Sequence, residues 1–324
     1  MHRLLPYIIF TLLACSTCRQ AAAGTGDTLV VQAGQVTIDA FANDSISTVI
    51  PFTRVGNLIV IKGKVDTTEG NFILDTGAPY LVLNETYFRH YPQSPQQDTE
   101  LQSAIGTERS TISKTTVGVF ELGEMKYKKL EADLVPLGHI ENSRGIKILG
   151  LLGIELFTRC EMIIDFEKGY IYLHRIGRKE SSTYKHVLLL EQSAYDEIPI
   201  DLMDNRIVTE IELAGKKRKF IVDCAAESNI LHSKLPQNVY DLITITRRVV
   251  LTGSGAKKVE ALYGDLKGMK IGRQELSSLP VLITNLENTC FSYNGCIDGV
   301  LGFNFLSLHR IGFNFVTRKM YIWK

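Results

Sequence analysis

Two aspartates set in apolar sequence are the residues of this chain best suited to chemistry. Asp75 interrupts the stretch FILDTGAPYLVLN, and Asp223 interrupts the similar stretch KFIVDCAAESNIL. Burying a lone carboxylate costs several kcal/mol unless it is hydrogen-bonded or paired. Asp75 therefore needs a partner, and Asp223 is the candidate, because a pair of carboxyl groups can act as general acid and general base.

The two aspartates occupy equivalent positions in an internal repeat. Asp223 follows Asp75 by 223 − 75 = 148 residues, and the sequence around them aligns without a gap. The matches at this shift include Ile50-Pro51 with Ile198-Pro199, Asn57 with Asn205, Phe72 with Phe220, and Val82-Leu83 with Ile230-Leu231. A shift of 149 residues aligns Leu152-Gly153 with Leu301-Gly302, and Tyr172 with Tyr321. Such extended self-similarity indicates a duplicated structural unit.

Each copy of the repeat is rich in strand signals. LIVIKGKV and NFILD flank the turn-rich DTTEG in the first copy, and RIVTEIEL and KFIVD flank AGKKR in the second, which predicts a hairpin before each aspartate. Each copy then closes with an apolar-apolar-Gly turn, a short helical stretch and an alternating hairpin such as CEMIIDFEKGYIYLHR. These patterns predict an all-β chain with a leader (1–23), an N-terminal hairpin extension (24–47), a first lobe (48–178), a linker (179–194) and a second lobe (195–324).

The sequence resembles the aspartic proteases, particularly the exported bacterial retropepsin-like group. The resemblance lies in Asp75-Thr76-Gly77-Ala78 within an apolar strand, the later Leu152-Gly153, and the duplication. It implies two acid-protease-like β-barrel lobes, related by a pseudo-twofold axis, with a cleft between them. It also implies that Asp75 and Asp223 meet at that axis and share one proton, because two carboxyl groups in contact cannot both ionise cheaply. One would activate a water for attack on a peptide carbonyl, and the other would protonate the carbonyl oxygen.

The same resemblance assigns supporting roles to the residues that follow each aspartate. Thr76 is expected to brace the two lobes across the axis, and Gly77 to permit a close approach. The second turn departs from the family pattern, with Cys224 and Ala225 in place of threonine and glycine. A thiol is a weaker donor than a hydroxyl, so we expect a weaker brace on that side. If the site of Ala225 requires a positive φ, strain of about 1–2 kcal/mol follows.

Glycine-containing segments lie between the aspartate turns and the closing glycine turns. SAIGTERST surrounds Gly106, and LTGSGAKK contains Gly253 and Gly255. In the family these positions carry hairpin flaps over the substrate. An ordinary glycine hairpin explains each segment equally well.

The N-terminus predicts export. MHRLLPYIIFTLLACSTC contains an early Arg3 and an apolar core that is too short to span a bilayer, which is typical of a signal peptide. Leu12-Leu13-Ala14-Cys15 resembles a bacterial lipobox and implies a lipid on Cys15, with the protein in the periplasm or at the outer membrane. Cleavage after Ala23, which would release a soluble protein, is the alternative.

The remaining cysteines are interpreted for an oxidising compartment. Cys290 and Cys296 bracket FSYNG, a loop short enough for a local disulfide. Cys160 and Cys224 stand alone in apolar sequence, so we expect buried thiols. No cysteine or histidine spacing indicates a zinc site, and we expect no metal.

Composition limits the partners. The net charge is +1 and no basic tract carries interleaved aromatic residues, so we expect no nucleic-acid partner. No nucleotide- or phosphate-binding motif is present, and we expect no cofactor. The expected protein is a monomer with a peptide or protein substrate, in contact with a membrane only through its lipid anchor.

Three functions are compatible with these patterns. The leading hypothesis is an exported aspartic endopeptidase. The alternative is a non-catalytic peptide-binding protein on the same fold, because the second turn is altered and a fold does not determine a function. A third possibility is that two chains pair their Asp75 lobes while the second lobe degenerates.

Overall fold

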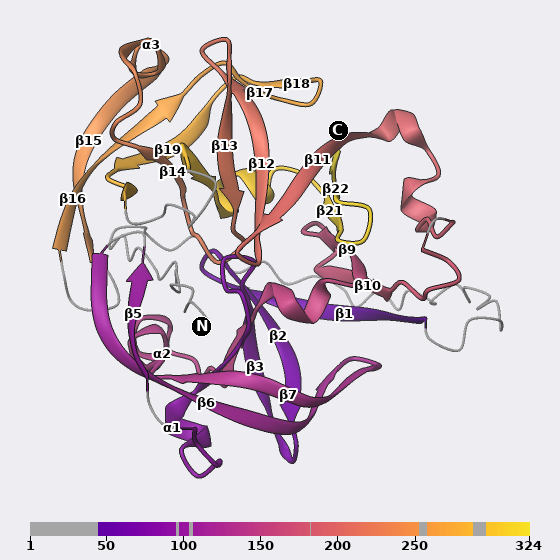
Figure 1. Ribbon diagram of the computed structural model, residues 1–324. Coiled ribbons are helices and arrows are strands. Elements are labelled where there is room, and N and C mark those ends of the chain that lie inside the picture. Colours follow the sequence, from indigo (N-terminus) through magenta and orange to yellow (C-terminus); the bar gives the residue numbers. More distant parts are fainter. Residues whose placement is uncertain (1–44, 95–96, 104–105, 182, 253–257, 288–295) are drawn as a thin grey trace, which may run out of the picture.

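The chain folds into two β-rich lobes that lie against each other, one formed by each copy of the repeat (Figure 1). The structure is a computed structural model that describes residues 45–94, 97–103, 106–181, 183–252, 258–287 and 296–324. The first lobe runs from indigo to magenta in Figure 1, and the second from salmon to yellow. This arrangement confirms the expected all-β fold with two lobes.

The first lobe is built mainly from strands of antiparallel hairpins, with short helices between some of them. Its strands are β1 (Ile46–Val55), β2 (Leu58–Val65), β3 (Thr68–Leu74), β4 (Leu81–Asn84), β5 (Gln97–Ser103), β6 (Gly106–Leu122), β7 (Met125–Val135), β8 (Gly150–Leu152), β9 (Cys160–Asp165) and β10 (Tyr170–Arg175). Its helices are α1 (Glu85–Phe88), α2 (Gly138–Arg144) and the 3-10 helix η1 (Ile154–Phe157).

The second lobe follows two 3-10 turns in the linker, η2 (Val187–Leu189) and η3 (Gln192–Ala194). Its strands are β11 (Tyr195–Met203), β12 (Arg206–Leu213), β13 (Lys216–Val222), β14 (Asn229–His232), β15 (Ile243–Thr252), β16 (Lys258–Leu266), β17 (Met269–Ile271), β18 (Gln274–Leu276), β19 (Leu279–Thr284), β20 (Gly299–Leu301), β21 (Ile311–Asn314) and β22 (Lys319–Trp323). Its helices are α3 (Gln237–Tyr240) and α4 (Phe303–Leu306).

The lobes share one strand topology, which confirms the internal repeat. In the first lobe, β3 runs parallel to β8 with Phe72 opposite Gly150. In the second, β13 runs parallel to β20 with Phe220 opposite Gly299. The pairs differ by 220 − 72 = 148 and 299 − 150 = 149 residues, the same two shifts that align the sequence. In both lobes the strand after the aspartate turn, β4 or β14, lies antiparallel to the closing strand.

The strands that lead to the two aspartates turn from solvent into the interior. The last three residues of β3 and of β13 are buried, whereas their first residues are not. Phe72 at the inner end of β3 packs edge-on against Phe120 of β6, with ring centroids 5.4 Å apart. Each strand therefore carries the residue that follows it, Asp75 or Asp223, into a packed apolar environment.

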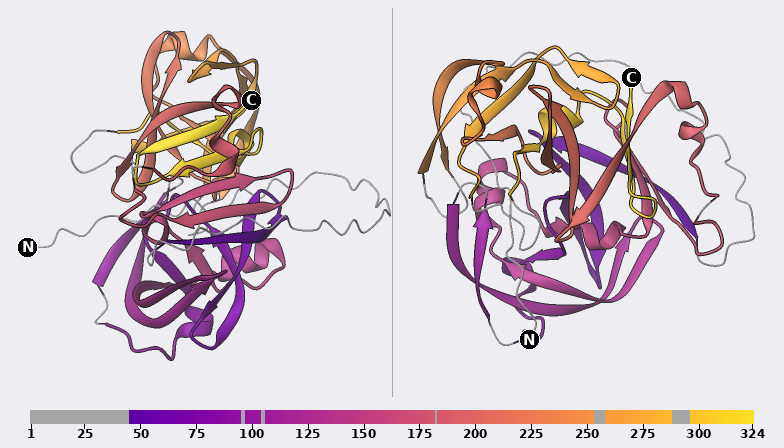
Figure 2. Two further views of the ribbon diagram at one scale, coloured as in Figure 1. Left: turned by 90° about the vertical axis from the view of Figure 1, so that its right-hand side faces the viewer. Right: turned by 45° about the horizontal axis from the view of Figure 1, so that its top comes forward.

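A sheet shared by both lobes joins them, in the strand order β1–β10–β9–β21–β22–β11. The lobes meet at the β9–β21 pair, where Ile164 lies opposite Ile311. The left view of Figure 2 shows the yellow strands of the second lobe beside the magenta strands of the first. Arg310 forms an ion pair with the buried Asp165 across this pair, at 2.7 Å. The closing hairpin of each copy, predicted from sequence, thus also forms the interface.

Several predictions concern residues that lie outside the described part of the chain. These are the leader (1–23), most of the N-terminal extension, Cys15, Gly253, Gly255 and Cys290. In the described residues, no helix combines the length and apolar composition that a bilayer crossing needs.

Candidate active site

The two aspartates occupy matching turns directly after β3 and β13. The backbone N–H of Asp75 donates to the carbonyl oxygen of Leu152 at 3.1 Å, and that of Asp223 donates to Leu301 at 2.9 Å. Each aspartate is thereby tied to the closing Leu-Gly segment of its own lobe. Asp75 is 1% exposed and Asp223 is 0% exposed, so both carboxyl groups are removed from water.

Backbone donors fix one oxygen of each carboxyl group. Asp75 Oδ1 accepts from the N–H groups of Gly77 and Ala78, at 2.9 and 3.0 Å. Asp223 Oδ1 accepts from those of Ala225 and Ala226, at 2.8 and 3.2 Å. These contacts compensate part of the cost of burying each carboxylate. The second oxygen, Oδ2, of Asp223 has no hydrogen-bond partner among the described residues.

The carboxyl group of Asp223 packs against the turn that holds Asp75. A β-carbon added at Gly77 would lie 2.4 Å from Asp223 Oδ2, which is far closer than side-chain atoms can approach. Gly77 therefore contacts both carboxyl groups, because its N–H also binds Asp75. The predicted close approach at Gly77 is present, and it is made by the side chain of the opposite aspartate.

Thr76 and Cys224 form a reciprocal brace between the lobes. The Thr76 hydroxyl donates to the carbonyl oxygen of Val222 and accepts from the N–H of Cys224, both at 2.9 Å. The Cys224 thiol donates to the carbonyl oxygen of Leu74 at 3.1 Å, and its sulfur accepts from the N–H of Thr76 at 3.3 Å. The cysteine thus makes both of the contacts that its threonine counterpart makes, although a thiol is the weaker partner.

Ala225 is accommodated without the strain that a left-handed backbone would cause. It is not among the described non-glycine residues with positive φ. Its side chain is buried in a cluster with Leu58 and Val60 of the first lobe. The second turn therefore keeps the backbone of the first while it carries two different side chains.

The closing glycine turns pack against the aspartate turns and form hydrogen bonds with them. A β-carbon at Gly153 would lie 2.1 Å from the carbonyl oxygen of Tyr80, so only glycine allows the two segments to touch. The N–H of the next residue, Ile154, donates to Ala78 at 2.9 Å. In the second lobe, the N–H of Phe303 donates to Ala226 at 2.7 Å.

Burial and mutual repulsion shift the titration of the pair. Burial raises the pKa of Asp75 well above its usual range, and the neighbouring Asp223 carboxylate raises it further. Burial also raises the pKa of Asp223, to about 6, against the lowering effect of the N–H donors of its own turn and of Arg206. The pair therefore retains a proton at pH values where an exposed aspartate is fully ionised.

Comparison with known proteins settles the family. The family model described as aspartyl protease matches residues 61–156 and 209–305, more than half of the chain, and each matched region lies within one copy of the repeat. The chain belongs to the aspartyl protease family. The solved structures that match include basic 7S globulin from soybean, at 7% sequence identity and a TM-score of 0.44, with 86% of this chain and 95% of that chain covered. A search of curated proteins gives no significant match.

Two features of the candidate site were not predicted from sequence. One is the ion pair between Arg144 of α2 and Glu227, which joins the lobes beside the second aspartate turn. The carbonyl oxygen of Glu227 also accepts from Asn57 Nδ2 at 3.0 Å. Burial raises the pKa of Glu227 to about 7, although Arg144 lowers it.

The other unpredicted residue is Arg206, whose side chain is 2% exposed and lies within electrostatic range of both aspartates. A signal for it exists in the sequence, because the repeat places Arg206 where the first copy has Leu58. A charged residue at a position that is apolar in the other copy marks a difference between otherwise matching sites.

The two segments predicted as flaps lie in hairpins. β5 pairs with β6 up to Ser103 opposite Gly106, and β15 pairs with β16 up to Thr252 opposite Lys258. Cys160 and Cys224 are buried free thiols, as expected. Cys296 is disulfide-bonded, but Cys290 lies outside the described residues, so their pairing stays a prediction.

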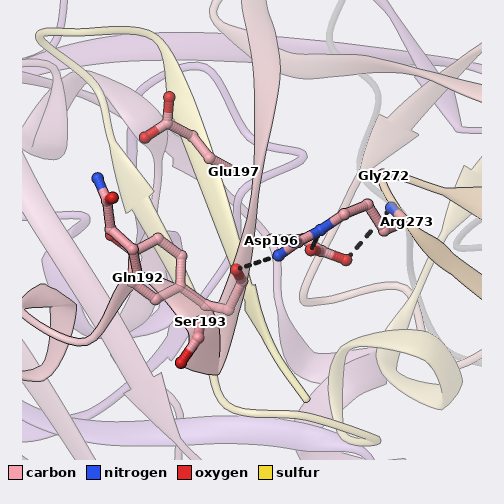
Figure 3. Close-up of a pocket in the computed structure, with 7 residues that line it drawn as sticks. Gln192, Ser193, Asp196, Glu197, Gly272 and Arg273 are labelled. Atoms are coloured by element: carbon pink, nitrogen blue, oxygen red, sulfur yellow. Dashed lines mark hydrogen bonds and ion pairs between the residues drawn. The ribbon is translucent and has the colours of Figure 1, made fainter.

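A pocket of about 560 Å³ on the second lobe is separate from the aspartates (Figure 3). Arg273 bounds it, with Nε 2.5 Å from Asp196 Oδ1 and a guanidinium hydrogen bond to the carbonyl oxygen of Tyr195. The lining residues are Gln192, Ser193, Tyr195, Asp196, Glu197, Gly272 and Arg273. Neither aspartate turn contributes to it. Across the described ranges, no group of three or more His, Cys, Asp and Glu side chains could hold a metal ion.

Proposed function

We propose that this protein is an aspartic endopeptidase that hydrolyses peptide bonds with a water activated by Asp75 and Asp223. The observation that carries the proposal is the reciprocal brace of Thr76 and Cys224, which holds the two buried aspartate turns face to face. A drifting, idle second lobe has no need to preserve these contacts.

The two carboxyl groups take different roles. In this proposal Asp223 is the base, and Asp75 carries the shared proton. In the first step, water oxygen bonds to the peptide carbonyl carbon, a water proton moves to Asp223, and the Asp75 proton moves to the carbonyl oxygen. In the second step, the proton on Asp223 moves to the peptide nitrogen and the C–N bond breaks. A hydroxyl proton of the intermediate returns to Asp75, which restores the starting pair and leaves a carboxylic acid and an amine.

Cleavage of a peptide library between pH 3 and pH 8 tests the proposal. The wild type should cleave, and Asp75→Asn and Asp223→Asn should each lose at least about 100-fold in kcat/KM, because the acid and the base each contribute roughly 10²–10⁴. Asp201→Asn is the matched control, since this aspartate is exposed on β11 and should leave the rate unchanged.

The other outcomes favour the competing functions. If neither wild type nor the Asn variants cleave, yet all bind peptides alike, the protein is a peptide-binding protein. If Asp223→Asn keeps full activity, the second lobe is idle and two chains must pair their Asp75 lobes.

We also propose that the enzyme is exported and lipid-anchored at Cys15, acting as a monomer on peptide or protein substrates in the periplasm or at the outer membrane. The leader and the Leu12-Leu13-Ala14-Cys15 sequence support this. Replacement Cys15→Ser should release the protein from membranes. A Cys15→Ser protein that is processed unchanged and stays membrane-bound would contradict the anchor.

A further inference from the structure

The two aspartates differ in their neighbour on the adjacent strand. In the second lobe β12 and β13 are neighbouring strands (Figure 1), with Ile207 opposite Val222. Continuing this antiparallel register by one residue places Arg206 opposite Asp223. In the first lobe Val60 of β2 lies opposite Ile73 of β3, so the same continuation places Leu58 beside Asp75. Arg206 and Leu58 are separated by 206 − 58 = 148 residues and are equivalent in the repeat. One aspartate therefore has a cationic neighbour and the other an apolar one.

Arg206 is one of the largest fully buried side chains of the described residues. A buried guanidinium is costly unless negative charge lies close to it. The acidic groups that attract it are Asp204, in the turn between β11 and β12, followed by Asp223 and Asp75. The neighbouring Cys224 thiol is held protonated by burial and contributes no charge. Asp204 and the Asp75–Asp223 pair (the dyad) thus supply negative charge near the buried guanidinium.

We propose that Arg206 is a positioning residue for the shared proton of the dyad. Its buried charge beside Asp223 keeps the negative charge on that aspartate and leaves the proton on Asp75. With Arg206 present, the singly ionised form of the pair therefore persists to a lower pH than it would beside an apolar residue. This inference rests on the proposed peptidase function and adds to it the origin of the asymmetry between the two aspartates.

The sign of the effect follows from electrostatics. A positive charge favours the ionised form of both carboxyl groups, so it lowers both ionisation steps of the pair. The singly ionised form, which is the active one, is bounded by these two steps. Removal of Arg206 should therefore move both limbs of the activity profile to higher pH. A nearby opposite charge typically shifts an aspartate by about 1–3 pH units, and burial limits screening by salt.

The experiment is the pH dependence of kcat/KM for Arg206→Leu, Arg206→Met and Arg206→Lys. Leucine reproduces the residue of the first lobe, and methionine is a longer apolar chain for the case in which leucine does not fold. Both should raise the acid limb by at least about 1 pH unit, while lysine should retain a profile close to the wild type. Arg89→Leu, which removes an exposed charge of the same type just after α1, is the control and should leave the profile unchanged.

A titration of the aspartate carboxyl carbons by ¹³C NMR gives a second readout that does not depend on turnover. The lower ionisation step of the pair should rise in the two apolar variants by the same amount as the acid limb. The inference is overturned if the wild type cleaves peptides but the acid limb of its kcat/KM profile and its NMR titration match those of a folded Arg206→Leu or Arg206→Met variant. Arg206 would then not position the proton. If the wild type cleaves nothing while the titration still shifts, the peptidase function fails and the electrostatic role of Arg206 stands.

Discussion

Replacement of Thr76 by valine tests the brace between the lobes. Valine keeps the shape of the side chain and removes only the hydroxyl. That hydroxyl bonds two backbone groups of the second lobe, the carbonyl of Val222 and the N–H of Cys224, both at 2.9 Å. Thr76 is 1% exposed, so water cannot reach either group to replace the lost contact.

The magnitude follows from the two groups left without this partner. Each buried backbone group that loses its hydrogen bond costs about 1–3 kcal/mol, so the free energy of unfolding should fall by roughly 2–6 kcal/mol. This is a large part of the 5–15 kcal/mol that is typical of a folded protein. Thr76→Ser is the matched control, because it keeps the hydroxyl and loses one methyl group, at a cost of about 1 kcal/mol.

Urea unfolding followed by tryptophan fluorescence measures the difference. The chain has one tryptophan, Trp323, which is buried in β22 of the sheet that joins the lobes. The midpoint should fall far more for Thr76→Val than for Thr76→Ser, with similar slopes. A valine variant within about 0.5 kcal/mol of the wild type, or a serine variant as unstable as valine, would refute the assigned role of the hydroxyl.

Three further outcomes are expected at the two turns. Gly77→Ala should abolish peptide cleavage, because the new β-carbon would lie 2.4 Å from Asp223 Oδ2. Ala225→Gly should leave cleavage intact. Equal cleavage rates for the two variants would contradict the close packing at Gly77. The pKa of Asp223 is raised to about 6 in the folded state, so the protonated carboxyl group favours folding at acid pH and the wild type loses this stability as pH rises through that value. Asparagine does not ionise, so Asp223→Asn should become more stable relative to the wild type as pH rises from 4 to 7. Urea unfolding at both pH values should show a gain that approaches about 3 kcal/mol, and a gain independent of pH would count against the shift. The Cys224 thiol should resist iodoacetamide in the native protein at pH 8 and react in urea, because burial raises its pKa. Detection of labelled Cys224 by mass spectrometry of the native protein would disprove this prediction.

Much of the fold follows from local sequence patterns. The hairpins that lead to Asp75 and Asp223, and the short helices after Gly153 and Gly302, were all predictable. Apolar alternation and turn residues act over a few neighbouring positions, so one sequence contains them in full. Because the sequence is repeated, each element predicted in one copy is also expected at the equivalent position of the other.

The second aspartate turn was predicted less well. From residue type alone, Cys224 was expected to weaken the brace. Ala225 was expected to strain the backbone if its φ were positive. The structure places the carbonyl of Leu74 and the N–H of Thr76 against the thiol, and it gives Ala225 a backbone without positive φ. These partners and angles depend on where the opposite lobe lies, which the identity of one residue does not state.

The sequence by itself determined that this protein is a duplicated β-rich chain with a matching aspartate in each copy. The tertiary structure alone decided that β9 and β21 join the lobes, that Arg144 meets Glu227, and that Arg206 is buried within electrostatic range of both aspartates. The physical reason is that strand periodicity arises from neighbouring residues, whereas pKa and pairing depend on the groups and the solvent around a side chain. At this site those groups come from segments roughly 150 residues apart, and only the docking of the two lobes brings them together.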